Sequence, residues 1–279
     1  MKKKSLNVTK KVNLKVSFHE IYKVFKSKIL KKVLKRNFAV AVSGGPDSLC
    51  LSYLSKKYGD EYGNKIKYFI VDHKLRKDSS KEAIFVKKLL KQNKIQANIL
   101  THTGKKPITN IQSQARDIRY NLISKECKKH DIKYLLTAHH QDDQIENFFI
   151  RLSRGSGLLG LSSINETSKF LKQITILRPL LSFRKNDLTK ITKEKFKSFV
   201  NDPSNQNEKY LRIRVRKIRK LLFKAGLDTS KVVRTIENLK MSKTALDFYV
   251  IQAKKKYIKV SKKRVVIDKN IFKYEADTI

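Results

Sequence analysis

The chain has very few cysteines for its length. Two of its 279 residues are cysteine, Cys50 and Cys127, and no Cys-x-x-Cys pair is present. This argues against an iron–sulfur cluster, a zinc knuckle or a disulfide framework. Both cysteines lie in apolar helical patterns and are expected to pack in a core, and their scarcity favours a cytoplasmic protein.

Long apolar runs are also lacking. No stretch is apolar over the length that a membrane-spanning helix needs, so we expect no membrane partner. The N-terminal segment, residues 1–15, is rich in lysine but lacks the apolar stretch of a secretory signal. An organelle-targeting arm stays open, although such arms favour arginine over lysine.

Acidic residues are outnumbered by basic ones. The chain carries 65 Lys and Arg against 24 Asp and Glu, which gives a formal net charge of +41. Such a charge predicts a polyanionic partner, with nucleic acid as the leading candidate, although a general lysine bias explains part of the excess. Arginine is clustered, which suggests sites that need its planar fork. The clusters are Arg116 and Arg119; Arg151 and Arg154; and Arg212, Arg214, Arg216 and Arg219.

A phosphate-binding loop is predicted at residues 38–48, FAVAVSGGPDS. An apolar strand leads through a glycine turn into a helical pattern, whose first N–H groups and dipole favour an anion. Gly44 and Gly45 allow a tight turn and a close approach, and Pro46 suits the first helical turn. Asp47 beside a phosphate suggests bound Mg²⁺. The predicted ATP contacts are Ser43, Gly44, Gly45, Pro46, Asp47 and Ser48. The alternative is a plain turn that only needs glycine.

Strands and helical patterns alternate along most of the chain. This predicts an α/β fold, a Rossmann-like parallel sheet of about five strands with helices on both faces, plus a small, mainly helical C-terminal region. Ser17 and Glu20 form a predicted capping box that opens the first helix. The expected strands are 38–42, 68–71, 97–100, 134–138 and 174–177. The expected divisions are 1–36, a basic arm and helix; 37–220, the catalytic domain; and 221–279, a helix and a short hairpin or strand.

Polar residues follow three of the predicted strands. They are the loop from Ser43 to Ser48, Asp72 with His73, and His139 with His140. Ligands of parallel sheets bind beyond the carboxyl ends of the strands, so one crevice is expected there. His73 alone is equally consistent with a hydrogen-bonded structural histidine.

A second cluster occupies residues 137–147, at a strand-to-helix junction. Helical spacing makes His139, Asp143 and Glu146 candidates for one side. The carboxylates of this cluster suit Mg²⁺, and the imidazoles suit phosphate contact or proton transfer. Capping of the helix by the aspartates is the alternative, and zinc is a third option that the lack of cysteine disfavours. Arg116 and Arg119 lie one turn apart and are expected either to clamp a phosphate or to lie on an exposed helix face.

These segments occur in an order that resembles the tRNA(Ile)-lysidine synthetase family of ATP pyrophosphatases. The likeness covers residues 36–220 and rests on the motifs Ser43–Ser48; Val71-Asp72-His73-x-Leu75-Arg76; Ala115-Arg116-x-x-Arg119-Tyr120; His139-His140-x-Asp142-Asp143-Gln144-x-Glu146; Arg154-Gly155-Ser156-Gly157-Leu158-x-Gly160-Leu161; Asn201-Asp202-Pro203-Ser204-Asn205; and Tyr210-x-Arg212. The chain departs from the family pattern at Asn147 and Ile213, and its C-terminal part is shorter than in many members, which bears on how tRNA is selected.

The resemblance implies ligation of free L-lysine to C2 of the wobble cytidine of the isoleucine tRNA with a CAU anticodon, through an adenylated base, with ATP and Mg²⁺. It implies catalytic roles for Asp47, His139, Asp143, Glu146 and Arg119, and metal binding by Asp47 and Asp143. Further ATP contacts would be His73, Arg116 and His140, and tRNA contacts Arg154, Arg212, Arg214 and Arg216. A homodimer is left open. The rival hypotheses are a tRNA thiolase of the same superfamily, which usually carries a cysteine pair, and a non-catalytic basic RNA-binding protein.

Overall fold

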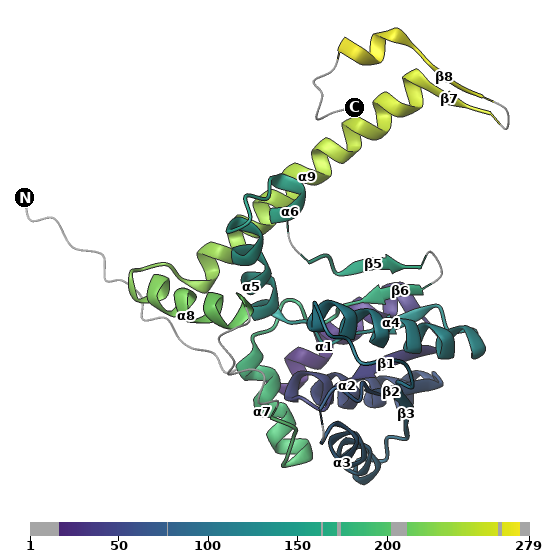
Figure 1. Ribbon diagram of the computed structural model, residues 1–279, viewed down its shortest axis with the longest axis vertical. Coiled ribbons are helices and arrows are strands. Elements are labelled where there is room, and N and C mark those ends of the chain that lie inside the picture. Colours follow the sequence, from purple (N-terminus) through teal and green to yellow (C-terminus); the bar gives the residue numbers. More distant parts are fainter. Residues whose placement is uncertain are drawn as a thin grey trace, which may run out of the picture. The chain divides into compact units, whose positions relative to one another are not determined.

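The computed structural model describes residues 17–76, 78–162, 164–171, 174–201, 211–261 and 264–273, which divide into two compact units (Figure 1). The first unit holds the described residues up to His140 and residues 167–201. Its helices are α1 (Phe18–Val33), α2 (Pro46–Tyr62), α3 (Ser79–Gln92), α4 (Ile111–Lys129) and α7 (Lys185–Phe196). Its strands are β1 (Phe38–Val42), β2 (Ile66–Asp72), β3 (Ala97–Thr101), β4 (Tyr134–Leu136), β5 (Thr167–Phe170) and β6 (Ile174–Leu177).

The strands form one sheet in the order β3-β2-β1-β4-β6-β5. The neighbours are parallel except β5, which runs antiparallel to β6 at the edge. Val42 pairs with Ile70, and Leu136 pairs with Leu177, so the carboxyl ends of the central strands lie along one edge. The α/β fold with a mainly parallel sheet is confirmed. The sheet has six described strands rather than about five, because the short, half-exposed β5 gives no strong apolar pattern.

Alternating strand residues build a core on each face of the sheet. Val40, Val42 and Ile70 pack against α1, α2, α3 and α7, whereas Ala39 and Phe69 pack against α4. Both cysteines are buried, Cys50 in the first core cluster and Cys127 in the second, as expected. Burial raises the pKa of both thiols, so neither is a reactive thiolate.

Helix α1 begins as the sequence predicts. Ser17 accepts a hydrogen bond from the amide of Glu20, and the Glu20 carboxylate accepts one from the amide of Ser17. The apolar stripe of this helix, which includes Phe25 and Ile29, is buried against the sheet. Each such side chain contributes about 1.5–3 kcal/mol of burial free energy.

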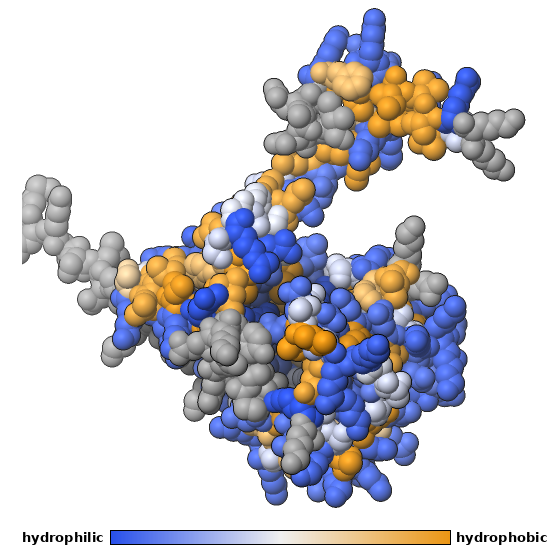
Figure 2. Space-filling view, viewed as in Figure 1, coloured by the Kyte–Doolittle hydropathy of each residue, from blue (hydrophilic) through white to orange (hydrophobic). Residues whose placement is uncertain are grey.

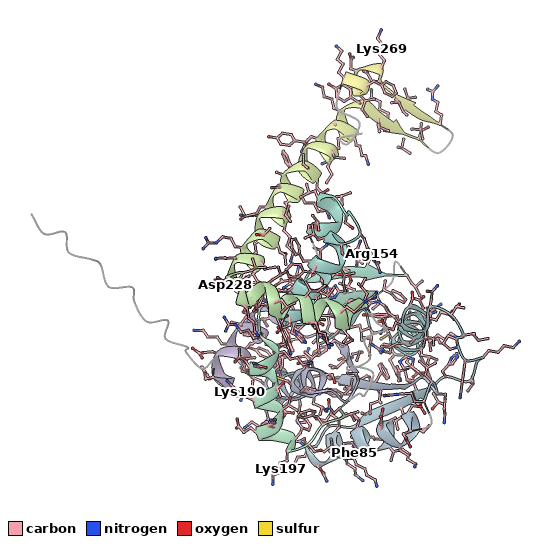
Figure 3. The ribbon with its side chains drawn as sticks, turned by 60° about the vertical axis from the view of Figure 1, so that its left-hand side comes forward. Phe85, Arg154, Lys190, Lys197, Asp228 and Lys269 are labelled. Atoms are coloured by element: carbon pink, nitrogen blue, oxygen red, sulfur yellow. The ribbon has the colours of Figure 1, made fainter. Side chains whose placement is uncertain are left out.

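The second unit contains residues 141–166 and the described residues beyond 210. Its helices are α5 (Gln141–Leu152), α6 (Leu158–Leu161), α8 (Leu211–Lys224) and α9 (Thr229–Tyr257), followed by β7 (Ile258–Val260), β8 (Val265–Ile267) and a 3₁₀ turn, η2 (Lys269–Lys273). Ile145 and Phe148 of α5 pack against Val232 and Ile236 of α9. Asp228 caps α9 by accepting from the amide of Lys231 (Figure 3). The hairpin β7–β8 confirms the alternating pattern predicted there.

The surface in view is largely hydrophilic over the first unit, with apolar side chains gathered over the hairpin of the second (Figure 2). Val260, Val265 and Ile267 are among the exposed apolar residues there. Within the described ranges, no helix is long and apolar enough to span a bilayer. The expected divisions near residues 36 and 220 stay predictions.

Candidate functional site

The glycine loop lies at the carboxyl end of β1 and leads directly into α2, as predicted. The Ser48 hydroxyl accepts hydrogen bonds from the amides of Ser43 and Gly44 at 3.2 and 3.1 Å, and donates to the Gly45 carbonyl at 2.9 Å. Gly44 has φ +84°, a conformation that favours glycine. A Cβ at this position would lie 2.4 Å from Cγ2 of Val86, so the turn needs glycine for space as well as for backbone angle.

Helix α7 and the segment after it hold the loop from a distant part of the sequence. The Thr192 hydroxyl, which is fully buried, donates to the Pro46 carbonyl at 2.6 Å. The amide of Val200 donates to the Gly44 carbonyl at 2.9 Å. These two contacts fix the backbone on both sides of Gly45, so the loop is shaped before any ligand arrives.

Asp47 and His140 meet at the carboxyl edge of the sheet although they follow different strands. His140 Nε2 lies 3.4 Å from Oδ2 of Asp47, and His140 is almost fully buried. The other carboxylate oxygen of Asp47, Oδ1, is buried and has no hydrogen-bond partner among the described residues. A buried carboxylate oxygen in that state is costly unless a cation or a donor reaches it, so Asp47 fits a Mg²⁺ ligand.

The described residues contain no group of three or more His, Cys, Asp or Glu side chains close enough to hold a metal ion by themselves. A Mg²⁺ ion on Asp47 would therefore take its other ligands largely from water and phosphate oxygens. That pattern is usual for Mg²⁺ bound with a nucleotide.

Asp72 shapes the turn after β2 and places His73. Its carboxylate accepts hydrogen bonds from the Ser79 and Ser80 hydroxyls at 2.8 and 2.7 Å and from the Lys74 amide at 3.0 Å. Burial would raise the pKa of Asp72, but these hydrogen bonds outweigh it and the pKa is lowered. The Asp72 carboxylate therefore stays charged and fixes the turn after β2 through these hydrogen bonds.

His73 contacts Arg119 of α4. Its Nε2 lies 3.5 Å from Nη2 of Arg119. Burial, assisted by the positive charge of Arg119, lowers the pKa of His73 to about 4, so the imidazole is neutral at pH 7. Burial also lowers the pKa of Arg119 itself. Arg116 is exposed, and its guanidinium lies 4.9 Å from the centre of the Tyr120 ring.

His139 belongs to the first unit and precedes α5, which begins at Gln141. Its Nδ1 lies 3.0 Å from the Thr137 hydroxyl, which orients the ring. Asp143 and Glu146 lie on α5, within the second unit. The helical spacing that groups the two carboxylates holds, but His139 is not part of that helix, because it lies in the segment between the end of β4 at Leu136 and the start of α5 at Gln141.

The carboxylates of α5 are paired with arginines of α8 inside the second unit. Glu146 is buried, and its Oε1 and Oε2 accept from Nε and Nη2 of Arg216 at 2.6 and 3.2 Å. Arg212 Nε lies 3.1 Å from Oε2 of Glu146, and its Nη2 lies 3.7 Å from Oδ1 of Asp143. Arg219 pairs with Asp142 at 2.9 Å. Burial lowers the pKa of Arg216, but its hydrogen bond to Glu146 and the negative charges of Glu146, Asp143 and Asp142 together outweigh burial and raise the pKa.

The four arginines predicted to bind nucleic acid therefore differ in their surroundings. Arg212 and Arg216 face α5, whereas Arg214 is exposed to solvent. Arg154 is exposed in the turn after α5 (Figure 3). The motifs at residues 202–205 and at Tyr210 lie outside the described residues.

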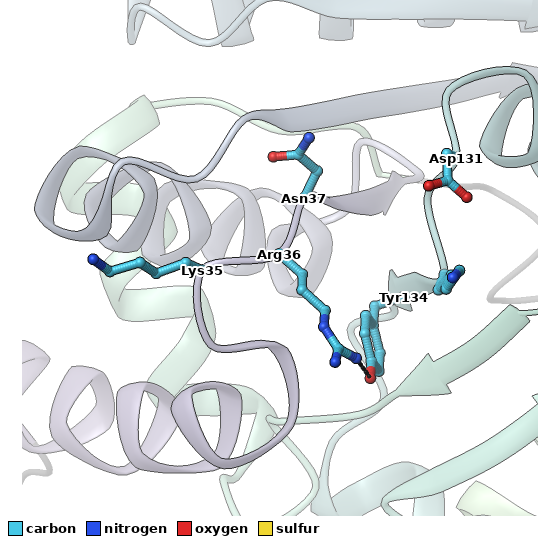
Figure 4. Close-up of a pocket in the computed structure, with 6 residues that line it drawn as sticks. Lys35, Arg36, Asn37, Asp131 and Tyr134 are labelled. Carbon is cyan, nitrogen blue, oxygen red and sulfur yellow. Dashed lines mark hydrogen bonds between the residues drawn. The ribbon is translucent and has the colours of Figure 1, made fainter.

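A separate hollow of about 440 Å³ lies at the opposite edge of the sheet, before β1 and β4 (Figure 4). Arg36 donates to the Tyr134 hydroxyl there at 3.0 Å. Lys35, Lys133 and Asp131 also line it, all of them exposed. It is remote from the strand ends that carry the predicted chemistry, so it is not part of the candidate site.

Sequence reasoning missed three residues of this edge. Thr192 and Val200 hold the loop through a backbone carbonyl each, a role that no residue pattern reveals. Arg178 directly follows β6 and is buried. The strand-end argument that selected His73 and His139 would have selected Arg178 as well.

Comparison with known proteins gives one matching family and close relatives. The profile of the PP-loop domain matches residues 17–222. The tRNA(Ile)-lysidine synthase of Orientia tsutsugamushi (strain Boryong) is 40% identical over 247 residues, which are 84% of this chain and 55% of that protein. The enzyme of the same name from Wolbachia pipientis wMel is 40% identical over 215 residues, 76% of this chain and 49% of that protein. The chain thus spans about half the length of the curated relatives it matches.

Among solved structures, the U34-tRNA thiolase NcsA from Methanococcus maripaludis, with its [4Fe-4S] cluster, is similar to this chain with a TM-score of 0.65. The match covers 79% of this chain and 78% of the thiolase at 20% sequence identity. At that identity the likeness shows the shared α/β fold and nothing about the reaction.

Proposed function

The chain belongs to the PP-loop family, and on that premise we propose that it ligates free L-lysine to C2 of the wobble cytidine in the isoleucine tRNA with a CAU anticodon. The acceptor and the amino acid come from the names of its relatives. The observation that carries the nucleotide part is the glycine loop at the amino end of α2, beside a buried oxygen of Asp47 that has no hydrogen-bond partner among the described residues.

The first step would be adenylation of the base. The C2 oxygen of the cytidine attacks the α-phosphorus of ATP, and the bond to the β,γ-pyrophosphate breaks. The backbone from Ser43 to Ser48 and the amino end of α2 would hold the phosphates, with His73 and Arg116 as further contacts. Mg²⁺ held by Asp47 would neutralise charge on the pyrophosphate when bound, and Asp143 of the second unit stays a predicted ligand.

The second step would be displacement of AMP. The lysine side-chain amine attacks C2, the C2–oxygen bond breaks, and the nitrogen loses a proton. His139, oriented by Thr137, and the carboxylate of Glu146 are the groups we assign to proton handling and to holding the cationic amine. Arg119, kept beside a neutral His73, would stabilise developing negative charge. Positioning and charge neutralisation account for the chemistry without a covalent enzyme intermediate.

The tRNA would bind through the basic surface, with exposed Arg154 and Arg214 on its backbone. Arg212 and Arg216, which pair with the α5 carboxylates, would contact tRNA only by exchanging those partners for phosphates. A cytoplasmic location and a homodimer stay predictions; sedimentation would test the second.

A sulfur-transfer reaction is the nearest rival. Cys50 and Cys127 are the only cysteines of the chain, and they pack in core clusters on opposite faces of the sheet. Two buried thiols separated by a sheet cannot join in one cluster or one persulfide relay. The thiolase hypothesis therefore has no cysteine chemistry to rest on.

The test is incorporation of radiolabelled lysine into tRNA with ATP and Mg²⁺. We expect labelled tRNA with the wild-type chain and none with Asp47→Ala. Asp60→Ala is the matched control, because Asp60 lies on the same helix and its exposed side chain pairs only with Lys56 among the contacts described. Absence of incorporation by the wild type, with sulfur transfer or RNA binding alone, would overturn the proposal.

A further inference from the structure

Arg178 occupies the carboxyl end of β6, in line with the residues of the candidate site. Leu136 of β4 pairs with Leu177, and the amide of Thr137 donates to the Leu177 carbonyl at 2.9 Å. Arg178 therefore follows directly beside the segment that carries His139. The Arg178 side chain is 6% exposed, and arginine is uncommon in buried positions. Its guanidinium is therefore enclosed by the protein and is not an ordinary surface charge.

Tyr120 of α4 lies between Arg178 and Arg116 in the chain of contacts at this edge. Its hydroxyl is hydrogen-bonded to Arg178, and its ring carries the guanidinium of Arg116. Burial and the positive charge of Arg116 both lower the pKa of Arg178. The charge of Arg116 acts on Arg119 in the same sense. Arg119 thus lies beside His73, and Arg116 and Arg178 both contact Tyr120, so that positive charges gather at this edge of the sheet.

Like charges held together in a partly buried place favour an anion among them. The phosphates of ATP already have the loop after β1 and the amino end of α2. Arg178 lies two strands away from β1, across β4, which at 4.7–4.9 Å per strand is about 10 Å. A second anion, distinct from the phosphates, fits that separation.

We propose that Arg178, oriented by Tyr120, binds the α-carboxylate of free lysine. The inference rests on the proposed function. Six single bonds separate the side-chain nitrogen of lysine from its carboxylate carbon, about 7–8 Å when extended. If the carboxylate of lysine binds Arg178, the side-chain amine of the extended lysine can reach a cytidine base held at the phosphate loop. The guanidinium fork matches a carboxylate with two parallel hydrogen bonds.

The test separates lysine binding from phosphate binding. Lysine ligation is measured over a range of lysine concentrations, and tRNA-dependent exchange of pyrophosphate into ATP is measured without lysine. For Arg178→Ala we expect KM for lysine to rise about 10- to 100-fold, the loss of a charge-assisted bidentate contact, with the exchange rate unchanged. Arg184→Ala, an exposed arginine of the same unit, should change neither.

Cadaverine, which is lysine without its carboxylate, supplies a readout that partial misfolding does not move. The wild type should prefer lysine to cadaverine in kcat/KM, and Arg178→Ala should lose that preference. Because Arg178 is buried, Arg178→Lys is measured too; it keeps the charge but not the fork, and should show an intermediate preference.

An unchanged KM for lysine with an unchanged preference would overturn the assignment. A fall in pyrophosphate exchange with the preference intact would also overturn it, because Arg178 would then serve the phosphates. A wild-type chain that exchanges pyrophosphate but never incorporates lysine would instead refute the proposed function itself.

Discussion

Replacing Gly44 by alanine should destabilise the first unit and weaken ATP binding, through the strained backbone angle and the contacts of the added Cβ. The left-handed backbone alone costs a non-glycine residue about 1–2 kcal/mol. The new Cβ would lie 2.4 Å from Cγ2 of Val86 and 3.1 Å from Cγ2 of Val200. Ordinary carbon contacts are about 3.5–4.0 Å, so the loop or the valines must move by about 1 Å, at about 1–3 kcal/mol more.

Gly63→Ala is the matched control. Gly63 has φ +73°, close to that of Gly44, and nothing lies within 4 Å of its added Cβ. It should lose only the backbone part of the free energy of unfolding, about 1–2 kcal/mol, and keep its ATP affinity. Gly44→Ala should lose about 2–5 kcal/mol and bind ATP about 10- to 100-fold more weakly, because the loop that holds the phosphates is displaced.

The assay is urea unfolding followed by tyrosine fluorescence, since the chain has 11 tyrosines and no tryptophan, together with ATP binding by calorimetry. Combining Gly44→Ala with Val86→Ala removes the methyl groups that clash. The double variant should lose less stability than the sum of the two single variants. Equal losses in Gly44→Ala and Gly63→Ala, or strict additivity with Val86→Ala, would refute the steric reasoning.

Three further changes should have distinct effects. Because the pKa of His73 is about 4 in the folded chain and about 6.5 unfolded, the free energy of unfolding should fall as pH drops from 6.5 to 4, by up to about 3 kcal/mol, and His73→Asn should remove this dependence in acid denaturation curves. Glu146→Gln should cost the second unit about 3–5 kcal/mol, measured by urea unfolding, because it leaves Arg216 without its buried carboxylate. Thr192→Val should cost about 1–2 kcal/mol in the same measurement and weaken ATP binding, because the Pro46 carbonyl loses its donor.

Each of these has a contrary outcome. If the acid denaturation curve of His73→Asn were the same as that of the wild type, the imidazole of His73 would titrate normally in the folded chain. The Asp142 carboxylate is more exposed than that of Glu146. If Glu146→Gln lost no more free energy of unfolding than Asp142→Asn, the buried pair of Glu146 and Arg216 would have no special role in stability. Tight ATP binding in Thr192→Val would show that the loop holds its shape without α7.

Local patterns predicted much of the fold. The capping box at Ser17, the run from Phe38 to Val42 and the helix of residues 111–129 each carry their own signal, and the structure has all three where expected. The edge strand β5 and helix α7 were missed, because a short half-exposed strand and a lysine-rich helix have weak apolar periodicity.

Contacts between residues far apart in the chain could not be predicted from the sequence. The strand-end rule grouped Asp47 with His140 and His73 with its neighbours, because parallel strands finish at one edge. It could not show that Thr192 and Val200 reach back to the loop from about 150 residues away, since a backbone carbonyl accepts from any donor. Nor could it show that Glu146 is paired with arginines of α8, because many basic residues compete for each carboxylate in this chain.

The central claim is that the chain activates a tRNA base by adenylating its C2 oxygen. The most direct measurement uses isoleucine tRNA whose wobble cytidine carries heavy oxygen at C2, with ATP, Mg²⁺ and lysine, and determines the mass of the released AMP. In the proposed reaction the C2 oxygen leaves with the phosphate, so AMP should carry the heavy isotope in proportion to lysine incorporated. Unlabelled AMP, with the heavy oxygen still in the tRNA, would contradict the account.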